Sequence, residues 1–273
     1  MTISIPITSV EHPALMPYRT LRQTVEHFRQ GIFVAEGEKV VQRLLETKLE
    51  ILSILITPEW LSYYQSALEE RQEKISVFVA EKDLLETIVG FNLHQGIMAL
   101  GKMPVQKNLG SLIAKSQTPR LLVAIDGLAN SENIGVLVRN CTAFGVQTIL
   151  VGETSSSPYL RRAVRNSMGT VFKIPVVHCE NLAETLTVLR NIHQFKIFAA
   201  HPHTEEHSIQ HIDFSVDCCI VFGSEGSGIS QQVLSACDTA VAIPMKPGVD
   251  SLNVASASAV FLYEVMRQRT CCS

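Results

Sequence analysis

The sequence predicts an α/β protein with two domains. Short apolar runs, typical of buried strands, alternate along the whole chain with segments whose apolar residues recur at helical spacing. The chain has 273 residues, longer than most single compact domains, and 46% of them are hydrophobic, enough for two sizeable cores. This alternation lapses over residues 102–119, which are rich in Pro, Gly, Ser and Asn, so we expect a linker there.

The first domain, residues 1–101, is expected to be a small α/β sandwich. Its apolar pattern predicts a long opening helix over 15–29 and another over 58–71, which begins at Pro58, a residue suited to a first helical turn. The other expected helices cover 37–47 and 81–89, and the expected strands cover 32–35, 51–56, 75–79 and 97–100.

The second domain, residues 120–273, is expected to hold a mostly parallel sheet with helices on both faces, because strands and helices alternate regularly in it. The expected strands cover 121–125, 148–151, 195–200, 218–222 and 239–243. The expected helices cover 132–143, 158–166, 181–193, 229–236 and 252–267.

Composition narrows the class of protein. No apolar stretch approaches the roughly 20 residues needed to cross a bilayer, and the N-terminus lacks a basic segment followed by an apolar one. The seven cysteines show no Cys-x-x-Cys spacing, so we expect them to be reduced and mostly buried. These features predict a cytoplasmic protein.

Charge is distributed unevenly. The net charge of −3 argues against coating nucleic acid by bulk electrostatics. However, the stretch between Glu153 and Glu180 contains no acidic residue and carries Arg161, Arg162, Arg165 and Lys173. It predicts either a local RNA-binding face or a solvated helix surface.

Polar residues also stand at three junctions between an apolar strand-like run and a helical one. These are Asn133-Ile-Gly-Val-Leu-Val-Arg139-Asn140, Phe222-Gly-Ser-Glu225-Gly-Ser-Gly228, and Ile243-Pro-Met-Lys-Pro-Gly-Val-Asp-Ser251-Leu-Asn253. Parallel α/β folds place their ligands at such junctions, so the three predict one site. A Rossmann glycine fingerprint, a P-loop and the hydrolase nucleophile elbow are all absent.

Taken in this order, the three segments resemble the signature motifs of the SpoU (TrmH-like) family of RNA ribose 2′-O-methyltransferases, within the SPOUT superfamily. The resemblance covers about residues 120–267 and includes Arg165-Asn-Ser-Met-Gly169. It extends more weakly to Phe33-Val-Ala-Glu-Gly37, which resembles the start of the family's L30e-like substrate-binding domain.

The resemblance implies a second domain tied in a deep trefoil knot, an exception to the rule that folds avoid knots. It also implies a homodimer whose sites borrow residues from the neighbouring chain, and S-adenosylmethionine as the cofactor. The implied cofactor-binding residues are Gly223, Ser224, Gly228, Ile243, Met245, Leu252 and Asn253. The implied catalytic residues are Asn133, Arg139, Glu225, Ser251 and Asn253.

Chemistry bears on these roles. A guanidinium with a pKa above about 12 is a poor base, so we expect Arg139 to grip the target phosphate and stabilise the developing oxyanion, and the proton acceptor stays open. Asn133 would orient Arg139 or the ribose, and Glu225 would hold Arg139 or its counterpart in the partner chain. The plainer interpretations are a charge before a helix for Glu225 and helix capping for Ser251 and Asn253.

The RNA itself is only partly specified. The resemblance nominates Arg165 as the leading phosphate ligand, with Arg161, Arg162 and Ser167 beside it; Arg19, Arg22 and Arg29 of the first domain could read RNA shape or simply be solvated. The additional N-terminal domain favours 23S rRNA over tRNA. Two other classes of protein remain: an RNA-binding family member without transfer activity, and a hydrolase of an adenosyl or nucleotide ligand. The sequence does not predict which nucleotide is methylated.

One histidine-rich tract has two interpretations. His201, His203, His207 and His211 have metal-like spacing, but no cysteine or carboxylate completes a clear ligand set. We therefore expect no metal there. The tract directly follows an apolar strand, so the alternative is a loop beside the cofactor.

Overall fold

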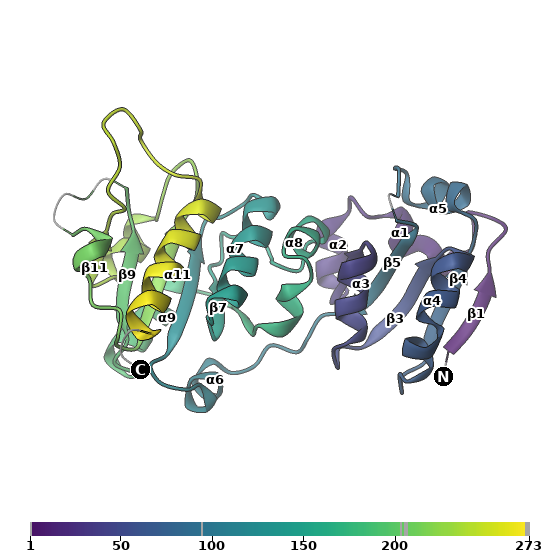
Figure 1. The fold of residues 1–273 in the computed structure, drawn as a ribbon, viewed down its shortest axis with the longest axis horizontal. Coiled ribbons are helices and arrows are strands. Elements are labelled where there is room, and N and C mark those ends of the chain that lie inside the picture. Colours follow the sequence, from purple (N-terminus) through teal and green to yellow (C-terminus); the bar gives the residue numbers. More distant parts are fainter. Residues whose placement is uncertain (1, 94, 203, 205–206, 271–273) are drawn as a thin grey trace. The chain divides into compact units, whose positions relative to one another are not determined.

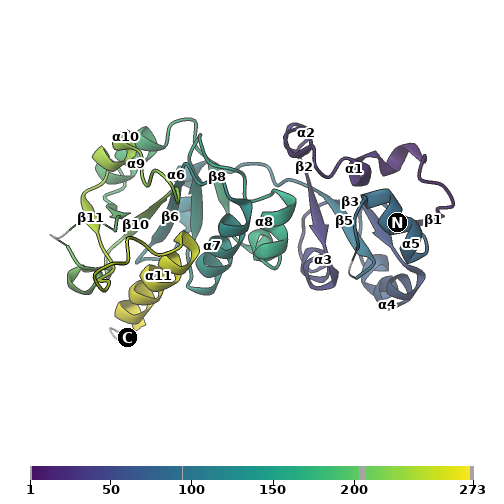
Figure 2. The same cartoon turned by 90° about the horizontal axis from the view of Figure 1, so that it is seen from above.

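The computed structural model describes residues 2–93, 95–202, 204 and 207–270 (Figures 1 and 2). Its contacts divide the chain into two compact units. The first comprises Met1–Val105 with Tyr159–Phe172, and the second comprises Gln106–Pro158 with Lys173–Ser273. Residues 159–172 thus pack with the first unit, whereas the sequence assigned them to the second domain.

The first unit contains a five-stranded mixed sheet in the order β1-β4-β3-β5-β2. Strand β1 pairs with β4 in parallel, as β3 does, whereas β5 runs antiparallel to both β3 and β2. The edge strand β1 was not predicted, because its isoleucines are only half-buried and its sequence is short. The strands are β1 (Thr2–Pro6), β2 (Ile32–Glu36), β3 (Ile51–Ile56), β4 (Ile75–Val79) and β5 (Ile97–Lys102).

Helices of the first unit follow the predicted pattern with one correction. The helix expected over 15–29 is broken, because the backbone leaves the helical region at Thr20 (φ −104°, ψ 28°) and helix resumes only at Thr24. The helical segments are η1 (Pro13–Leu15), α1 (Met16–Arg19), α2 (Thr24–Arg29), α3 (Glu38–Leu45), α4 (Pro58–Glu69), α5 (Lys82–Val89), α8 (Arg161–Asn166) and η2 (Thr170–Lys173), whose last residue belongs to the second unit.

The second unit contains a six-stranded sheet in the order β11-β9-β10-β6-β7-β8, and all of its strand pairs are parallel. This confirms the predicted α/β class with a parallel sheet. The three-residue strand β8 was too short to be predicted. The strands are β6 (Leu121–Asp126), β7 (Thr148–Val151), β8 (Val176–His178), β9 (Lys196–Ala200), β10 (Cys218–Gly223) and β11 (Thr239–Val241).

Helices cover both faces of this sheet (Figure 2). The short apolar segment inside the predicted linker forms a helix, because the Asn108 side chain accepts a hydrogen bond from the Ser111 N–H and caps it. The helices are α6 (Leu109–Lys115), α7 (Ser131–Ala143), α9 (Leu182–Asn191), the 3-10 turn η3 (Ile209–His211), α10 (Gln231–Ser235) and α11 (Val254–Thr270).

Strand alternation divides the core of the second unit into two layers. On one face, Leu122 and Ala124 of β6 pack in a buried cluster with residues of α6, α9 and α10. On the other face, α7 and α11 lie side by side and α11 contacts β10. This arrangement brings the start of α11 to the carboxyl end of β10.

Two further expectations concern membranes and cysteines. No described helix is long and apolar enough to cross a membrane. Cys141, Cys179, Cys218 and Cys219 are buried free thiols, as expected, and burial raises the pKa of each. Cys271 and Cys272 lie outside the described residues.

Candidate active site

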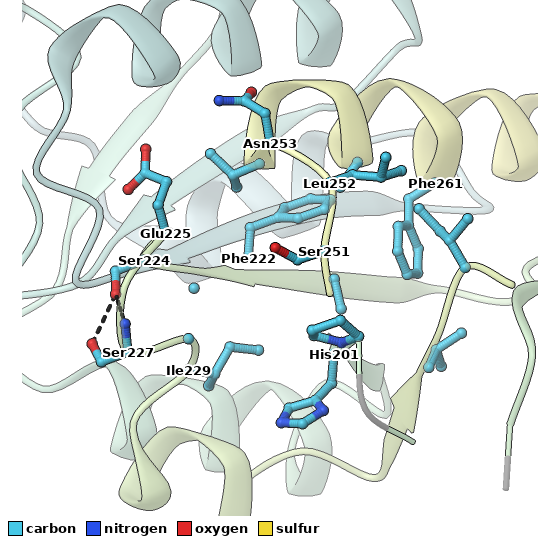
Figure 3. A pocket seen from close by; sticks show the side chains of 18 of the residues that line it. His201, Phe222, Ser224, Glu225, Ser227, Ile229, Ser251, Leu252, Asn253 and Phe261 are labelled. Carbon is cyan, nitrogen blue, oxygen red and sulfur yellow. Dashed lines mark hydrogen bonds between the residues drawn. The ribbon is translucent and has the colours of Figure 1, made fainter. Parts of the chain in front are cut away.

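A pocket of about 480 Å³ lies at the carboxyl ends of β9, β10 and β11 (Figure 3). Ligands of parallel sheets bind at this edge. Three segments distant in the sequence enclose the pocket. Its lining residues are Ala200, His201, Pro202, Phe222, Gly223, Ser224, Glu225, Gly226, Ser227, Gly228, Ile229, Val241, Ile243, Met245, Ser251, Leu252, Asn253, Val254, Ala257 and Phe261.

The glycine-rich loop after β10 closes on itself. The Ser224 N–H donates to the Gly228 carbonyl at 3.0 Å, and the Gly228 N–H donates back to Ser224 at 3.1 Å. A Cβ atom at Gly223 would lie 2.3 Å from the Gly228 carbonyl carbon and 2.4 Å from the Ile229 nitrogen. Only glycine therefore permits this loop to fold back against the end of β10.

Asp126, the last residue of β6, anchors the far end of the same loop. Its side chain is buried, with 5% exposed, and accepts a hydrogen bond of 2.6 Å from the Ser230 N–H. Ser230 is the N-cap residue of α10, so the carboxylate satisfies a backbone donor at the start of that helix. Sequence reasoning missed Asp126, although an acidic residue ending an apolar strand was a usable signal.

A chain of side-chain hydrogen bonds joins the three predicted motifs. The amide nitrogen of Asn133, on α7, donates to Glu225 Oε1 in the glycine-rich loop. The amide nitrogen of Asn253, just before α11, donates to Asn133 Oδ1 at 3.1 Å. Three residues predicted from separate motifs therefore form one connected cluster at the pocket rim.

Two further asparagines hold α7 in place. The Asn130 side chain caps α7 by accepting hydrogen bonds from the N–H groups of Glu132 and Asn133, at 2.9 and 3.3 Å. At the other end of the motif, Asn140 donates to the Ala255 carbonyl at 2.8 Å and to Ser258 Oγ at 3.0 Å. These contacts fix the register of α7 against α11.

Arg139 lies elsewhere on α7. It follows Asn133 by six residues, which turns its side chain by roughly 240° around the helix, and it is exposed. It does not line the pocket, and among the described residues the side chain that bonds to Glu225 is Asn133 rather than Arg139. The hypothesis that Glu225 holds the Arg139 of the same chain therefore has no support in this geometry.

The floor of the pocket is apolar. The rings of Phe222 and Phe261 meet edge to face with centroids 5.8 Å apart, and both line the cavity. The predicted cofactor-binding residues all lie on the lining: Gly223, Ser224, Gly228, Ile243, Met245, Leu252 and Asn253. Ser251 and Glu225 join them there.

The histidine tract contributes one pocket residue. His201 follows β9 and lines the cavity, which agrees with a loop beside a ligand. His203 lies outside the described residues, and the residues that are described contain no cluster of potential metal ligands. Sequence reasoning did not include His201, Phe222 or Phe261 among the site residues, because their contribution depends on how the strand ends converge.

The predicted phosphate ligands lie in the first unit, on or beside α8. Glu36, only 6% exposed, pairs with Arg161 and, at 2.8 Å, with Arg165. The Arg165 side chain remains 57% exposed, and Arg162 is also exposed. Ser167, in contrast, is fully buried and its hydroxyl donates to the Val164 carbonyl, so in this conformation it presents no group to a nucleic acid.

Comparison with known proteins shows to which family the chain belongs. Residues 120–263 match the model of the SpoU rRNA Methylase family. The chain belongs to the SpoU rRNA methylase family. The match includes the three motifs around the pocket and therefore confirms the resemblance seen in the sequence.

The similarity of this SpoU family member to individual relatives extends beyond residues 120–263. The chain is 33% identical over 198 residues to the 23S rRNA (guanosine-2'-O-)-methyltransferase RlmB of Acinetobacter baylyi, covering 71% of this chain and 79% of that protein. It is 28% identical over 241 residues to an uncharacterized tRNA/rRNA methyltransferase of Mycobacterium bovis, covering 87% and 82%.

Solved structures share the fold over nearly the full length. A structure described as an RNA 2'-O ribose methyltransferase superimposes with a TM-score of 0.76 at 25% identity, covering 99% of this chain and 100% of that one. An AdoMet-bound rRNA methyltransferase from Sinorhizobium meliloti gives 0.82 at 23% identity, covering 97% and 98%. The likeness to the second structure concerns the fold alone.

Proposed function

We propose that this protein is an S-adenosylmethionine-dependent methyltransferase that methylates a ribose 2′-hydroxyl in structured RNA, with 23S rRNA as the target. The observation that carries the proposal is the pocket, which the second and third family motifs line and to whose rim Asn133 of the first motif is hydrogen-bonded. The RlmB relative, named for the same reaction on a guanosine of 23S rRNA, supports the choice of substrate. We place the reaction in the cytoplasm, as the sequence predicts.

The residues of the pocket suit this cofactor. About 480 Å³ lies within the range of small-molecule sites, and the glycine-rich loop lets backbone N–H and C=O groups approach a ligand closely. Phe222, Phe261 and Ile229 give apolar surface for an adenosyl group, and Glu225 places negative charge at the rim. Bound there, S-adenosylmethionine would supply an electrophilic methyl group.

Arg139 is the proposed contact to the RNA. Its guanidinium stays charged at neutral pH, so it can bind a phosphate near the target ribose and stabilise negative charge developing on the 2′-oxygen. Its exposure leaves it accessible to RNA. The role of Asn133 would be to orient Glu225 and Asn253 at the pocket rim, and not to orient Arg139.

Binding of the wider RNA is proposed for the first unit as an L30e-like domain. Arg165 and Arg162 present exposed positive charge there, and Arg161 is turned inward to Glu36. Contacts of this kind would weaken as salt concentration rises. The trefoil knot, likewise implied by family membership, belongs to the same proposal.

A homodimer completes the proposed enzyme. The outer face of α7 and α11 exposes Val136, Val260 and Tyr263, at 36%, 40% and 53%, so a second copy could bury apolar surface there. Arg139 lies on α7 as well, which would bring it toward the partner's site. Light scattering should give the mass of two chains, and a monomeric mass in active enzyme would contradict this assembly.

The decisive experiment measures transfer of labelled methyl from S-adenosylmethionine to unmodified rRNA and tRNA, digested to nucleosides. Label should appear in a 2′-O-methyl nucleoside of 23S rRNA and fall by at least about 100-fold in Arg139→Ala, because an electrostatic contact to the transition state is lost. Lys115→Ala, which removes an exposed charge on α6, is the matched control. Absence of transfer to any RNA despite cofactor binding would contradict the proposal.

A tRNA target is the second candidate. It is favoured by the relative from Mycobacterium bovis, whose name covers both tRNA and rRNA. Label confined to the tRNA fraction in the same assay would select it.

A further inference from the structure

The hydrogen-bond chain at the pocket rim has a defined direction. A backbone N–H can only donate, and the Ala255 N–H donates to Asn253 Oδ1 at 2.9 Å. The amide nitrogen of Asn253 must then be the group that faces Asn133, and it donates to Asn133 Oδ1 at 3.1 Å. Asn133 in turn has its amide nitrogen toward Glu225 and donates to Oε1.

This direction determines what Glu225 can be. Each group in the chain donates a hydrogen bond to the next, starting from the N-terminal turn of the 17-residue helix α11, so the last group, Glu225, must accept one at Oε1. A carboxylate satisfies this requirement at Oε1. A carboxylic acid protonated at Oε1 would place two donors against each other.

The second carboxylate oxygen is available to a ligand. In the described part of the chain no donor reaches Glu225 Oε2, although the residue is exposed and lines the pocket. Figure 3 shows the side chain at the rim, on the same side as Asn253. One oxygen is thus held by Asn133, and the other is open where an RNA hydroxyl could enter.

The plain alternative for Glu225 is a charge that stabilises the following helix. The geometry argues against it, because the backbone N–H at the start of α10 is already satisfied by Asp126 through Ser230. Moreover, α10 has only five residues, so its dipole is small. Glu225 is directed to α7 instead.

We propose that Glu225 is the proton acceptor in methyl transfer, and that Asn133 and Asn253 are positioning residues that fix its carboxyl group at the pocket rim. This rests on the proposed function. The 2′-oxygen forms a bond to the methyl carbon while the carbon–sulfur bond breaks, and the hydroxyl proton passes to Glu225 Oε2. Charge balances, because the sulfonium becomes a neutral thioether and the carboxylate becomes a neutral acid.

Other groups suit this role less well. Arg139 stays protonated at working pH and cannot take a proton. Among the lining residues that the structure describes, the only other ionisable side chain is His201, and Figure 3 places it toward the opposite end of the cavity from Glu225 and Asn253. The three motif residues gather at the Glu225 end.

The test is the single-turnover rate of methyl transfer as a function of pH in wild-type enzyme, Glu225→Gln and Glu132→Gln. The glutamine at 225 can still accept from Asn133 through its amide oxygen, so the pocket is retained and only the basic group is lost. Glu132 is an exposed acid on α7, one residue from Asn133, and controls for the change in charge.

We expect Glu225→Gln to lower the rate by about 10² to 10⁴-fold, as for loss of a general base, and to abolish the fall in rate at acid pH. Its affinity for S-adenosylmethionine, measured by calorimetry, should stay within about threefold of wild type. Glu132→Gln should behave as wild type throughout. In Asn133→Ala the fall at acid pH should persist, with a smaller loss of rate, because Glu225 remains but is less well held.

Two results would overturn the assignment. One is a Glu225→Gln enzyme that keeps the wild-type rate and acid limb; the other is a loss explained wholly by weaker cofactor binding. Failure of the wild-type enzyme to methylate any RNA would instead contradict the proposed function, so the two failures are distinguishable.

Discussion

Substitution of Gly223 by alanine tests whether the pocket depends on the closed loop after β10. The new Cβ atom would lie 2.3 to 2.5 Å from three backbone atoms of Gly228 and Ile229, and no side-chain rotation can relieve contact with backbone. To reach an ordinary separation of 3.4 Å or more, the loop must move outward by about 1 Å. We therefore expect the paired hydrogen bonds between Ser224 and Gly228 to break.

The cost can be worked from these contacts. Two lost hydrogen bonds account for about 1 to 3 kcal/mol. Overpacking against rigid backbone adds about 1 to 3 kcal/mol. We expect the free energy of unfolding of the second unit to fall by about 2 to 6 kcal/mol, and binding of S-adenosylmethionine to be lost because Gly223, Ser224 and Gly228 all line the pocket.

Urea denaturation and calorimetric titration with the cofactor measure the two effects. Gly226→Ala is the matched control, since it lies in the same loop and its Cβ would have no atom within 4 Å. That variant should keep wild-type stability. If Gly223→Ala behaves as Gly226→Ala does, the loop is not held by the close approach described here.

Two further predictions concern stability. Arg269 donates to the carbonyls of Pro119, Arg120, Phe214 and Val216, so Arg269→Ala should lower the free energy of unfolding by about 2 to 4 kcal/mol in denaturant titrations. The control is Arg267→Ala, which removes a partly exposed ion pair with Glu264 and should change the free energy of unfolding by less than about 1 kcal/mol. Burial lowers the pKa of His178 in the folded protein, so the unfolded chain binds a proton at this residue more readily. The contribution of His178 to the free energy of unfolding should therefore be fully present above the unfolded pKa of about 6.5 and should decline as the pH falls below that value. In thermal melts, the stability of His178→Gln should decline less at low pH than that of the wild type. A decline equal to that of the wild type would show that His178 is not the group responsible.

Much of the fold could be predicted because its signals are local. Runs such as Leu121–Asp126 are apolar throughout, as strands buried on both faces must be, and the six-stranded sheet is parallel as expected. The errors occurred where local signals are weak. The expected opening helix breaks at Thr20, where the backbone leaves the helical region, and the β8 strand has only three residues.

The sequence by itself determined the class of fold, the three motifs and their family, because these depend on residue type and spacing along the chain. Only the tertiary structure decided that Asn133 reaches Glu225 and Asn253 rather than Arg139, and that Ser167 is buried. It also revealed Asp126 beside the site and decided between the two interpretations of the tract that begins at His201, which lines the pocket. The physical reason is that side-chain direction across a parallel sheet depends on helix rotation and strand register, which are set by packing between segments 100 or more residues apart, such as Asp126 and Ser230.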